Sequence, residues 1–274
     1  MLIYGKEIRD RVKNRISEAA QHIPMKMAVL QVGADEAAGS YIRGIKKFAD
    51  ETGVNVEVLN LPGDASEALV LKTIEELNNA RDITGIMLQT PFPDHIAVNK
   101  VINSISYHKD VEGIHNYNLG KLISKEEGVK PCTPKAVLSL LEHYQVPIEG
   151  QRVVIVGRSM TVGSPLATMM TGKNGTVTLC HSRTRDLAEE TKRADILVAA
   201  LGKINFITPD MVNEQCVIID VGTNFDENGK MYGDVHEEAK AKAKMASAVP
   251  GGVGVITVAE LFDNLLLLAQ QTEK

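Results

Sequence analysis

Residues 152–165, RVVIVGRSMTVGSP, hold the clearest pattern for ligand chemistry in this chain. A run of apolar β-forming residues is followed by Gly157, a loop of small residues and Gly163. Gly157 would let the chain turn tightly after a strand, and backbone N–H groups at the start of the next helix could then face a pyrophosphate. The spacing is Gly-x-Ser-x-x-x-Gly rather than Gly-x-Gly-x-x-Gly, so a strand-to-helix turn without a ligand remains the alternative.

Side chains near this turn indicate which dinucleotide would bind. An acidic residue about 20 positions after the glycine turn normally holds the adenosine ribose hydroxyls. Here residues 180–185 read CHSRTR and contain no acid. Ser182, Arg183 and Arg158 are suited instead to a 2′-phosphate, because a guanidinium donates paired hydrogen bonds to phosphate. This favours NADP over NAD, and the alternative is that the arginines are solvated surface.

The segments after the turn predict a doubly wound α/β domain. Short apolar runs rich in β-branched residues occur at 176–180, 195–200 and 216–222, with polar segments between them. This alternation is typical of parallel strands buried on both faces.

The N-terminal half repeats this α/β alternation. Strands are predicted over 26–33, 54–61 and 83–91, and helices at about 36–52 and 66–79. The third strand ends in Gln89, ahead of a proline-rich turn that contains His95. Ligands of open α/β sheets bind at the carboxyl ends of strands, so Gln89 is a candidate ligand, although a turn-capping amide would have the same position. His95 is a weaker candidate, because a surface histidine explains it equally simply.

Composition and charge exclude several classes of protein. The 274 residues suffice for two modest domains, and the net charge of −5 has both signs interspersed, which leaves no basic stripe for nucleic acid or a membrane surface. The charged N-terminus does not read as a signal peptide, and no uninterrupted apolar run approaches about 18 residues. Cys132, Cys180 and Cys216 form no C-x-x-C pair, so neither a disulfide nor a zinc site is predicted. We expect a cytoplasmic protein that binds a small molecule and no metal, nucleic acid or membrane.

Taken together, the motifs resemble the methylenetetrahydrofolate dehydrogenase/cyclohydrolases of folate one-carbon metabolism over essentially the whole chain. The matching segments are VGADEAAGSYI (32–42), GIMLQTPFPDH (85–95), KDVEGIH (109–115), NLGKL (118–122), PCTPKAV (131–137), VVIVGRSMTVGSP (153–165), TVTLCHSRT (176–184), ADILVAALGK (194–203), IIDVGTN (218–224) and VPGGVGVIT (249–257).

The resemblance implies two α/β domains and a homodimer. Residues 1–135 and 251–274 would form a catalytic, folate-binding domain, and residues 136–250 a Rossmann-type NADP-binding domain. The C-terminal helix would return to the first domain, and folate would bind between the two.

The resemblance also implies roles for single residues. Tyr41 matches the tyrosine that stacks on the aminobenzoyl ring of folate, Gln89 the active-site glutamine, and Glu112 the pterin-binding carboxylate. The folate-facing loop is matched by Pro250, Gly251 and Gly252, and the cofactor site by Gly157, Arg158, Ser159, Gly163, Ser182, Arg183 and Thr223.

Five positions depart from the family pattern. Ile45 stands where a Tyr-x-x-x-Lys motif has the lysine that serves the cyclohydrolase step. Glu112 replaces an aspartate and Thr223 an isoleucine, while Val255 and Ile256 replace proline and methionine. Hydride loss from a methylene bridge needs no base, whereas hydrolysis of the methenyl product needs proton transfer. Ile45 therefore predicts an NADP-dependent methylenetetrahydrofolate dehydrogenase with weak or absent cyclohydrolase activity.

Two alternatives stay open. The first is the ordinary bifunctional enzyme, with another group in place of the lysine; Lys46 is the nearest, but one residue along a helix rotates a side chain by about 100°, away from that position. The second is a non-catalytic folate- or nucleotide-binding protein, against which Tyr41, Gln89 and the glycine turn argue.

Overall fold

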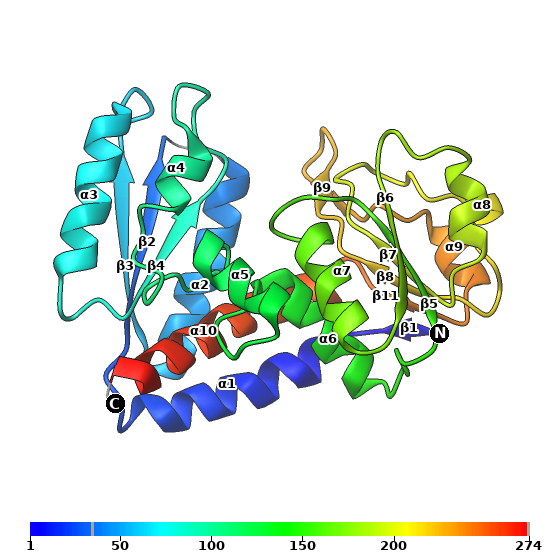
Figure 1. The fold of residues 1–274 in the computed structure, drawn as a ribbon, viewed down its shortest axis with the longest axis horizontal. Coiled ribbons are helices and arrows are strands. Elements are labelled where there is room, and N and C mark those ends of the chain that lie inside the picture. The colour runs from blue at the N-terminus through cyan, green and yellow to red at the C-terminus, as the bar shows by residue number, and fades with distance from the viewer. Residues whose placement is uncertain (34–35, 273–274) are drawn as a thin grey trace. The chain divides into compact units, whose positions relative to one another are not determined.

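The computed structural model in Figure 1 describes residues 1–33 and 36–272. Ala34 and Asp35, in the motif at 32–42, lie outside the described residues. The chain divides into two compact units: unit 1 comprises Met1–Asp10 and Pro131–Thr257, and unit 2 comprises Arg11–Lys130 and Val258–Lys274. Two of these divisions fall near the expected domain boundaries at 135/136 and 250/251, whereas the grouping of the first ten residues with unit 1 was not expected.

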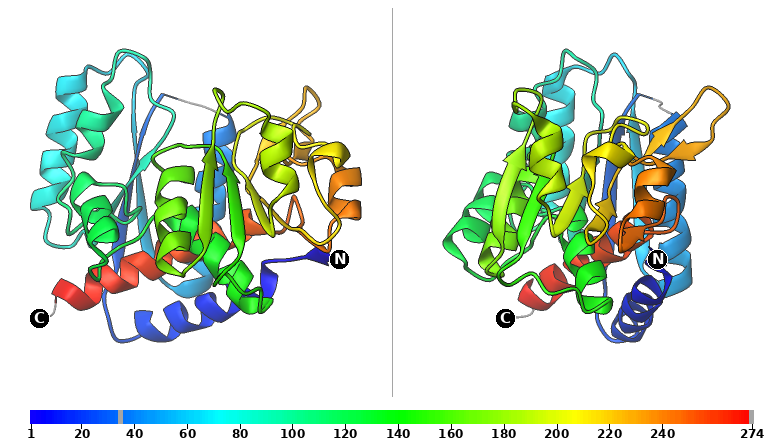
Figure 2. Two further views of the ribbon diagram at one scale, coloured as in Figure 1. Left: turned by 45° about the vertical axis from the view of Figure 1, so that its right-hand side comes forward. Right: turned by 90° about the vertical axis from the view of Figure 1, so that its right-hand side faces the viewer.

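Unit 2 is built on a parallel sheet of three strands in the order β3-β2-β4. The strands are β2 (Lys26–Val32), β3 (Asn55–Leu61) and β4 (Gly85–Gln89), and the helices are α2 (Glu36–Thr52), α3 (Glu67–Asn79), α4 (Val98–Ile102) and α5 (Asn116–Ser124). Figures 1 and 2 show α2 and α3 on opposite faces of this sheet. Leu30 and Leu88 of the sheet pack with Ile74 of α3, so the apolar runs of the sequence are buried as predicted.

Unit 1 holds a parallel sheet of six strands in the order β1-β11-β8-β7-β5-β6. The strands are β1 (Leu2–Ile3), β5 (Arg152–Val156), β6 (Thr176–Cys180), β7 (Ile196–Ala199), β8 (Val217–Asp220) and β11 (Met245–Ser247), and a hairpin is formed by β9 (Asn224–Phe225) and β10 (Met231–Tyr232). Helices are α6 (Cys132–His143), α7 (Gly163–Gly172), α8 (Leu187–Lys192) and α9 (Glu237–Lys242), with a 3₁₀ turn at Pro209–Met211.

Helices cover both faces of the unit 1 sheet. Val153 and Ile155 pack in a cluster with residues of α6 and α7, whereas Val154 and Val156 pack in a second cluster with residues of α9. Alternate residues of one strand thus enter two cores, as the doubly wound fold requires.

The N-terminal strand β1 explains why the first residues belong to unit 1. The Ala246 N–H donates to the Met1 carbonyl at 2.9 Å, and the Ala248 N–H donates to that of Ile3 at 3.0 Å. Ile3 is completely buried. Helix α1 (Lys6–Ala20) begins only after this strand.

The C-terminal helix α10 (Val253–Thr272) begins in unit 1 and ends in unit 2. Its segment Val253–Gln271, with a mean hydropathy of 1.5, is the one stretch in the described chain that is long and apolar enough to cross a membrane. Most of that stretch, 61%, is buried within the fold, as in the core helix of a globular protein.

Candidate active site

The glycine turn after β5 is confirmed by close backbone contacts. Gly157 has φ +126°, and a Cβ there would lie 2.1 Å from the Ala200 carbonyl oxygen. A Cβ on Gly163 would lie 1.8 Å from the Gly157 carbonyl oxygen. Only glycine fits either position, which leaves backbone accessible at the start of α7.

Hydrogen bonds within the loop hold its shape. The Ser159 hydroxyl accepts the Val162 N–H at 3.1 Å, and the Ser164 hydroxyl donates to the Arg158 carbonyl at 3.0 Å. The side chains of Arg158 and Ser159 are themselves exposed. The loop is therefore fixed by its own residues while it presents a guanidinium to solvent.

The loop after β6 lies beside this turn. Val156 and Cys180 are paired residues of β5 and β6, and the Gly157 N–H donates to the Cys180 carbonyl at 2.9 Å. The His181 Nδ1 accepts the Arg183 N–H at 3.1 Å, which leaves the Ser182 and Arg183 side chains exposed. Two arginine-bearing loops thus meet at the carboxyl edge of the sheet, where parallel strands end and dinucleotides bind. Thr223, also exposed, follows β8 at the same edge.

In unit 2, Gln89 is an unusual buried amide. It is 7% exposed, and its Nε2 donates to the Thr90 carbonyl at 2.8 Å. Its Oε1 is the one buried side-chain nitrogen or oxygen in the described part of the chain that lacks a hydrogen-bond partner. A buried acceptor without a donor is costly, so Gln89 stays a candidate ligand.

Glu112 lies beside the end of the same strand. Its carboxylate accepts the Leu88 N–H at 3.3 Å. Burial, and then the neighbouring Asp110, raise the pKa of Glu112 to about 8, while the bond from Leu88 opposes this shift. Glu112 is therefore mostly protonated at neutral pH in the ligand-free protein.

Two residues that sequence reasoning did not single out for this purpose shape the Glu112 loop. The buried Asp110 carboxylate accepts the Gly113 N–H at 3.0 Å and the His115 N–H at 2.8 Å. From α10, the completely buried Asn264 donates through Nδ2 to the carbonyls of Val111 and Lys130, both at 2.9 Å. An asparagine among leucines of an apolar helix was the only sequence signal for this second contact.

Helix α2 places Ile45 within the core. Ile45 is 0% exposed and lies on one apolar stripe with Ile42 and Phe48, whose ring is 4.7 Å from that of Phe262. The partly buried Tyr41 precedes Ile45 by four residues, so the two share a helix face. Lys46 is exposed, as the predicted rotation requires.

The loop at 250–252 is shaped by the N-terminus of unit 1. The Gly5 N–H donates to the Gly251 carbonyl at 2.8 Å, and Gly251 has φ +104°. A Cβ on Gly252 would lie 2.4 Å from the Ala248 carbonyl oxygen, while Pro250 is exposed. Val255 and Ile256, which stand where the family pattern has proline and methionine, follow this loop. Val255 is partly buried and Ile256 is completely buried.

Other candidates serve the fold. His95 bonds through Nε2 to the Ala65 carbonyl at 2.9 Å, which gives it a structural role. All three cysteines are buried, and none of them forms a disulfide bond. Within residues 1–33 and 36–272, no three His, Cys, Asp or Glu side chains are grouped so as to hold a metal ion.

Two family descriptions match the chain. Residues 3–112 match the tetrahydrofolate dehydrogenase/cyclohydrolase catalytic domain, and residues 131–273 match the NAD(P)-binding domain of the same family. The chain belongs to the tetrahydrofolate dehydrogenase/cyclohydrolase family. Tyr41, Gln89 and Glu112 fall in the first match, and the glycine turn and both arginine loops fall in the second.

Individual relatives are similar over nearly the whole chain. Bifunctional protein FolD 2 of Syntrophomonas wolfei is 63% identical over 271 residues, which cover 99% of this chain and 100% of that protein. The crystal structure of the bifunctional FolD methylenetetrahydrofolate dehydrogenase/cyclohydrolase of Campylobacter jejuni has a TM-score of 0.95 at 36% identity and covers 99% of both chains. The Trypanosoma brucei dehydrogenase-cyclohydrolase, solved with NADP and an inhibitor, has a TM-score of 0.94 at 28% identity and covers 100% of this chain and 98% of that one. These likenesses confirm the predicted fold class.

Proposed function

We propose that this protein is an NADP-dependent 5,10-methylenetetrahydrofolate dehydrogenase that forms 5,10-methenyltetrahydrofolate. The choice of NADP over NAD rests mainly on two exposed arginines, Arg158 and Arg183. They lie on loops that are joined by the Gly157–Cys180 hydrogen bond. Guanidinium groups on two adjacent loops suit a 2′-phosphate, and no acid occupies the place of a ribose ligand. The NADP bound by the Trypanosoma brucei relative supports this choice.

The chain's residues bind and orient the reactants. When bound, NADP supplies the hydride acceptor. The glycine turn gives the pyrophosphate access to backbone N–H groups, and Ser182 adds a hydroxyl near the arginines. On the folate side, Gln89 offers an unpaired Oε1, and Glu112 offers a carboxylate to the N–H donors of the pterin. No protein base is required, because oxidation removes a hydride and leaves a resonance-stabilised methenyl cation.

Hydrolysis of that cation separates two candidate functions. The bifunctional names of the Syntrophomonas wolfei and Campylobacter jejuni relatives favour an enzyme that also makes 10-formyltetrahydrofolate. Ile45, fully buried where the family pattern has lysine, favours a dehydrogenase with little hydrolysis. A positioned acid–base group contributes about 10²- to 10⁴-fold to such a proton transfer, and an isoleucine has none. Both candidates share the dehydrogenase step. A homodimer stays a prediction from the family resemblance, and a cytoplasmic location stays a prediction from the composition and cysteine usage.

The experiment for the shared step is NADPH formation from 5,10-methylenetetrahydrofolate by the purified protein. We expect turnover with NADP that far exceeds turnover with NAD. No NADPH formation in the presence of measurable folate and NADP binding would contradict the proposal and favour a non-catalytic binding protein. Equal efficiency with both cofactors would refute the cofactor assignment alone.

A further inference from the structure

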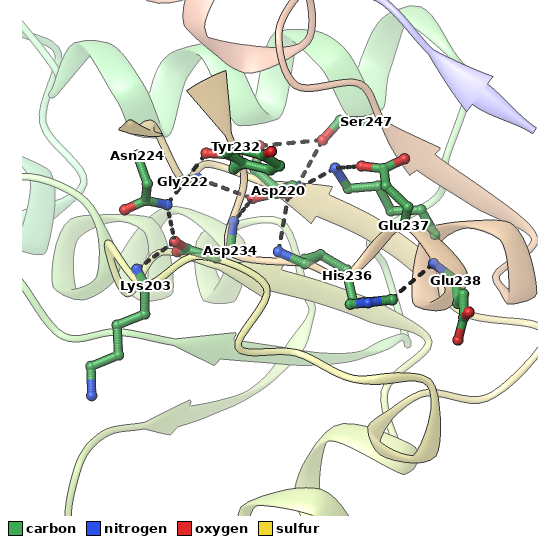
Figure 3. Close-up of polar contacts among 12 residues, drawn as sticks. Lys203, Asp220, Gly222, Asn224, Tyr232, Asp234, His236, Glu237, Glu238 and Ser247 are labelled. Atoms are coloured by element: carbon green, nitrogen blue, oxygen red, sulfur yellow. Dashed lines mark hydrogen bonds and ion pairs between the residues drawn. The ribbon is translucent and has the colours of Figure 1, made fainter. Parts of the chain in front are cut away.

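Three loops at the carboxyl edge of the unit 1 sheet are joined by a buried network of charges. They are residues 200–203 after β7, residues 221–224 after β8, the last of which begins β9, and residues 233–236 after β10. Figure 3 shows Asp220 and Asp234 at the centre of this network, with Asn224, Glu237 and Ser247 around them. None of these buried groups is among the candidate cofactor residues described above, so the role of the network is a separate question.

Asp234 holds the first loop through consecutive backbone groups. It is 0% exposed, and its carboxylate accepts the N–H groups of Leu201 at 2.5 Å, Gly202 at 3.1 Å and Lys203 at 2.8 Å. The Asn224 Nδ2 donates to the same carboxylate at 2.9 Å, which ties in the second loop. Four donors thus converge on one buried carboxylate, and each of them would lose a strong acceptor if the side chain were replaced by an uncharged one.

Asp220 holds the other side of the network. Its buried carboxylate accepts the N–H groups of Gly222 at 3.1 Å and Asp234 at 2.9 Å, and it pairs with the Lys240 ammonium at 3.1 Å. Lys240 is itself 3% exposed. A buried ion pair is rarely a net source of stability, and what this one does do is fix one specific arrangement of the groups around it.

The close packing around both carboxylates leaves little freedom for other geometries. A Cβ on Gly233 would lie 1.8 Å from the Asp220 Oδ2, and one on Gly222 would lie 2.4 Å from the Asp234 Oδ1. The fixed loops are the ones beside the candidate cofactor residues. Ala200, which begins the first loop, contacts Gly157 of the glycine turn, and Thr223 lies between Gly222 and Asn224.

We propose that Asp234 and Asp220, with Lys240 as counter-ion, are positioning residues that set the loops 200–203 and 221–224 for the dinucleotide. This inference rests on the proposed function, because it assigns the network to the NADP site of that enzyme. The carboxylates touch no ligand themselves. They act through the backbone of Leu201–Lys203 and Gly222, so loss of either charge displaces the loops and weakens cofactor binding while the folate residues of unit 2 stay unchanged.

The test compares two variants of the network with two controls. Asp234→Asn keeps the side-chain shape but sets an NH₂ group against two of the four donors, whichever way the amide is turned. Asn224→Ala removes one donor from the intact carboxylate. Glu237→Gln alters the exposed partner of Lys240, at 3.0 Å, outside the buried pair. Leu140→Ala opens a cavity at a completely buried position of α6 in the same unit, and serves as the control for lost stability. Each variant is assayed for the dissociation constant of NADP, for both KM values, and for Tm.

For Asp234→Asn we expect the KM and dissociation constant of NADP to rise on the order of tenfold or more, with the KM of methylenetetrahydrofolate nearly unchanged. Asn224→Ala should shift the NADP values in the same direction by a smaller factor, and it decides the question if Asp234→Asn does not fold. Glu237→Gln should leave the values within about twofold, because an exposed ion pair contributes little. Leu140→Ala should lower Tm without raising the KM of NADP.

Two results would overturn this inference while leaving the proposed function intact. One is unchanged NADP binding in folded Asp234→Asn, or in Asn224→Ala where the former is unfolded. The other is a parallel rise in the KM of NADP in Leu140→Ala, which would show that lost stability alone is responsible. If the unaltered protein bound no NADP, the proposed function would fail, and this inference with it.

Discussion

The Glu112 carboxylate accepts the Leu88 N–H at 3.3 Å, one residue before Gln89 in the same strand. Two candidate folate ligands from separate segments are thereby held at the carboxyl end of β4. One of them offers an unpaired amide oxygen and the other a carboxyl group with a raised pKa. This pairing leads to predictions about pH and about the loop that carries Glu112.

Folate affinity should rise with pH through the pKa of Glu112. The free protein holds Glu112 protonated below about pH 8, whereas the pterin donors favour the ionised form. Binding measured between about pH 6.5 and 8.5 should therefore tighten, with release of a proton at the lower pH. Glu112→Gln should abolish this dependence and weaken binding at the upper pH by about 1.5 to 3 kcal/mol. Glu112→Asp, the control, keeps a carboxylate and should retain most of the affinity. If the glutamine variant bound folate as tightly as the unaltered protein at both pH values, Glu112 would be excluded from the pterin site.

The same group affects stability in a definite direction. Because its folded pKa is raised to about 8 from 4.5, the native state binds a proton there that the unfolded chain has already lost. The free energy of unfolding contributed by Glu112 should fall as pH rises from about 4.5 to about 8 and level off above that. Urea unfolding of the protein and of Glu112→Gln across this window measures the difference. A difference that does not change with pH would show that the pKa of Glu112 is not raised.

Asn264 should prove important for the Glu112 loop. Asn264→Leu removes donors from the carbonyls of Val111 and Lys130, which should lower the free energy of unfolding by about 1 to 3 kcal/mol and raise the KM of the folate. Thr257→Ala is the control on the same helix, since its hydroxyl donates only to the Val253 carbonyl, a few residues earlier, at 3.2 Å. That variant should change stability by less than about 0.5 kcal/mol. Equal effects of the two substitutions would argue against a special role for Asn264.

The preference for NADP should depend on Arg183. Arg183→Asp replaces a guanidinium that can bind phosphate with a carboxylate that can accept hydrogen bonds from ribose hydroxyls. The ratio of kcat/KM for NADP to kcat/KM for NAD should therefore fall by tenfold or more, which corresponds to about 1.4 kcal/mol or more. Arg193→Asp makes the same change in charge before β7, at the opposite edge of the sheet, and should leave the ratio unchanged. A similar loss of preference in both variants would assign the effect to net charge.

Local patterns sufficed to predict the longer strands of both sheets and two helices of unit 2, whereas shorter elements that depend on long-range contacts were missed. The helix at 36–52 and the strand at 176–180 have the predicted bounds, because periodicity and β-branched runs are local signals. Strand β1 was not predicted, because it forms only by pairing with β11, in which Ile3 lies opposite Ser247, far away in the sequence. The tight glycine turn was predicted from spacing, whereas the Asp234 network could not be. A single aspartate gives no sign of the four donors that the fold brings to it.

The most specific prediction is that Ile45, which stands where the family pattern has lysine, leaves the protein with little hydrolysis. Position 45 is fully buried on the apolar stripe of α2, and the neighbouring Lys46 is exposed. Ile45→Lys should therefore lower stability, because part of a charged side chain enters an apolar core. It should also restore part of the hydrolysis by bringing an amine to the face shared with Tyr41. Ile45→Met, of similar polarity and size, is the matched control and should change neither activity. Loss of hydrolysis in Lys46→Ala would point to a displaced lysine.

The decisive measurement follows both half-reactions on one preparation of the unaltered protein: NADPH formation from methylenetetrahydrofolate, and decay of methenyltetrahydrofolate above the buffer rate. We expect rapid NADPH formation with accumulation of the methenyl compound, and enzymatic hydrolysis slower than oxidation by about 10²-fold or more. Hydrolysis as fast as oxidation would contradict the role assigned to Ile45 and establish the bifunctional enzyme that the names of its relatives describe.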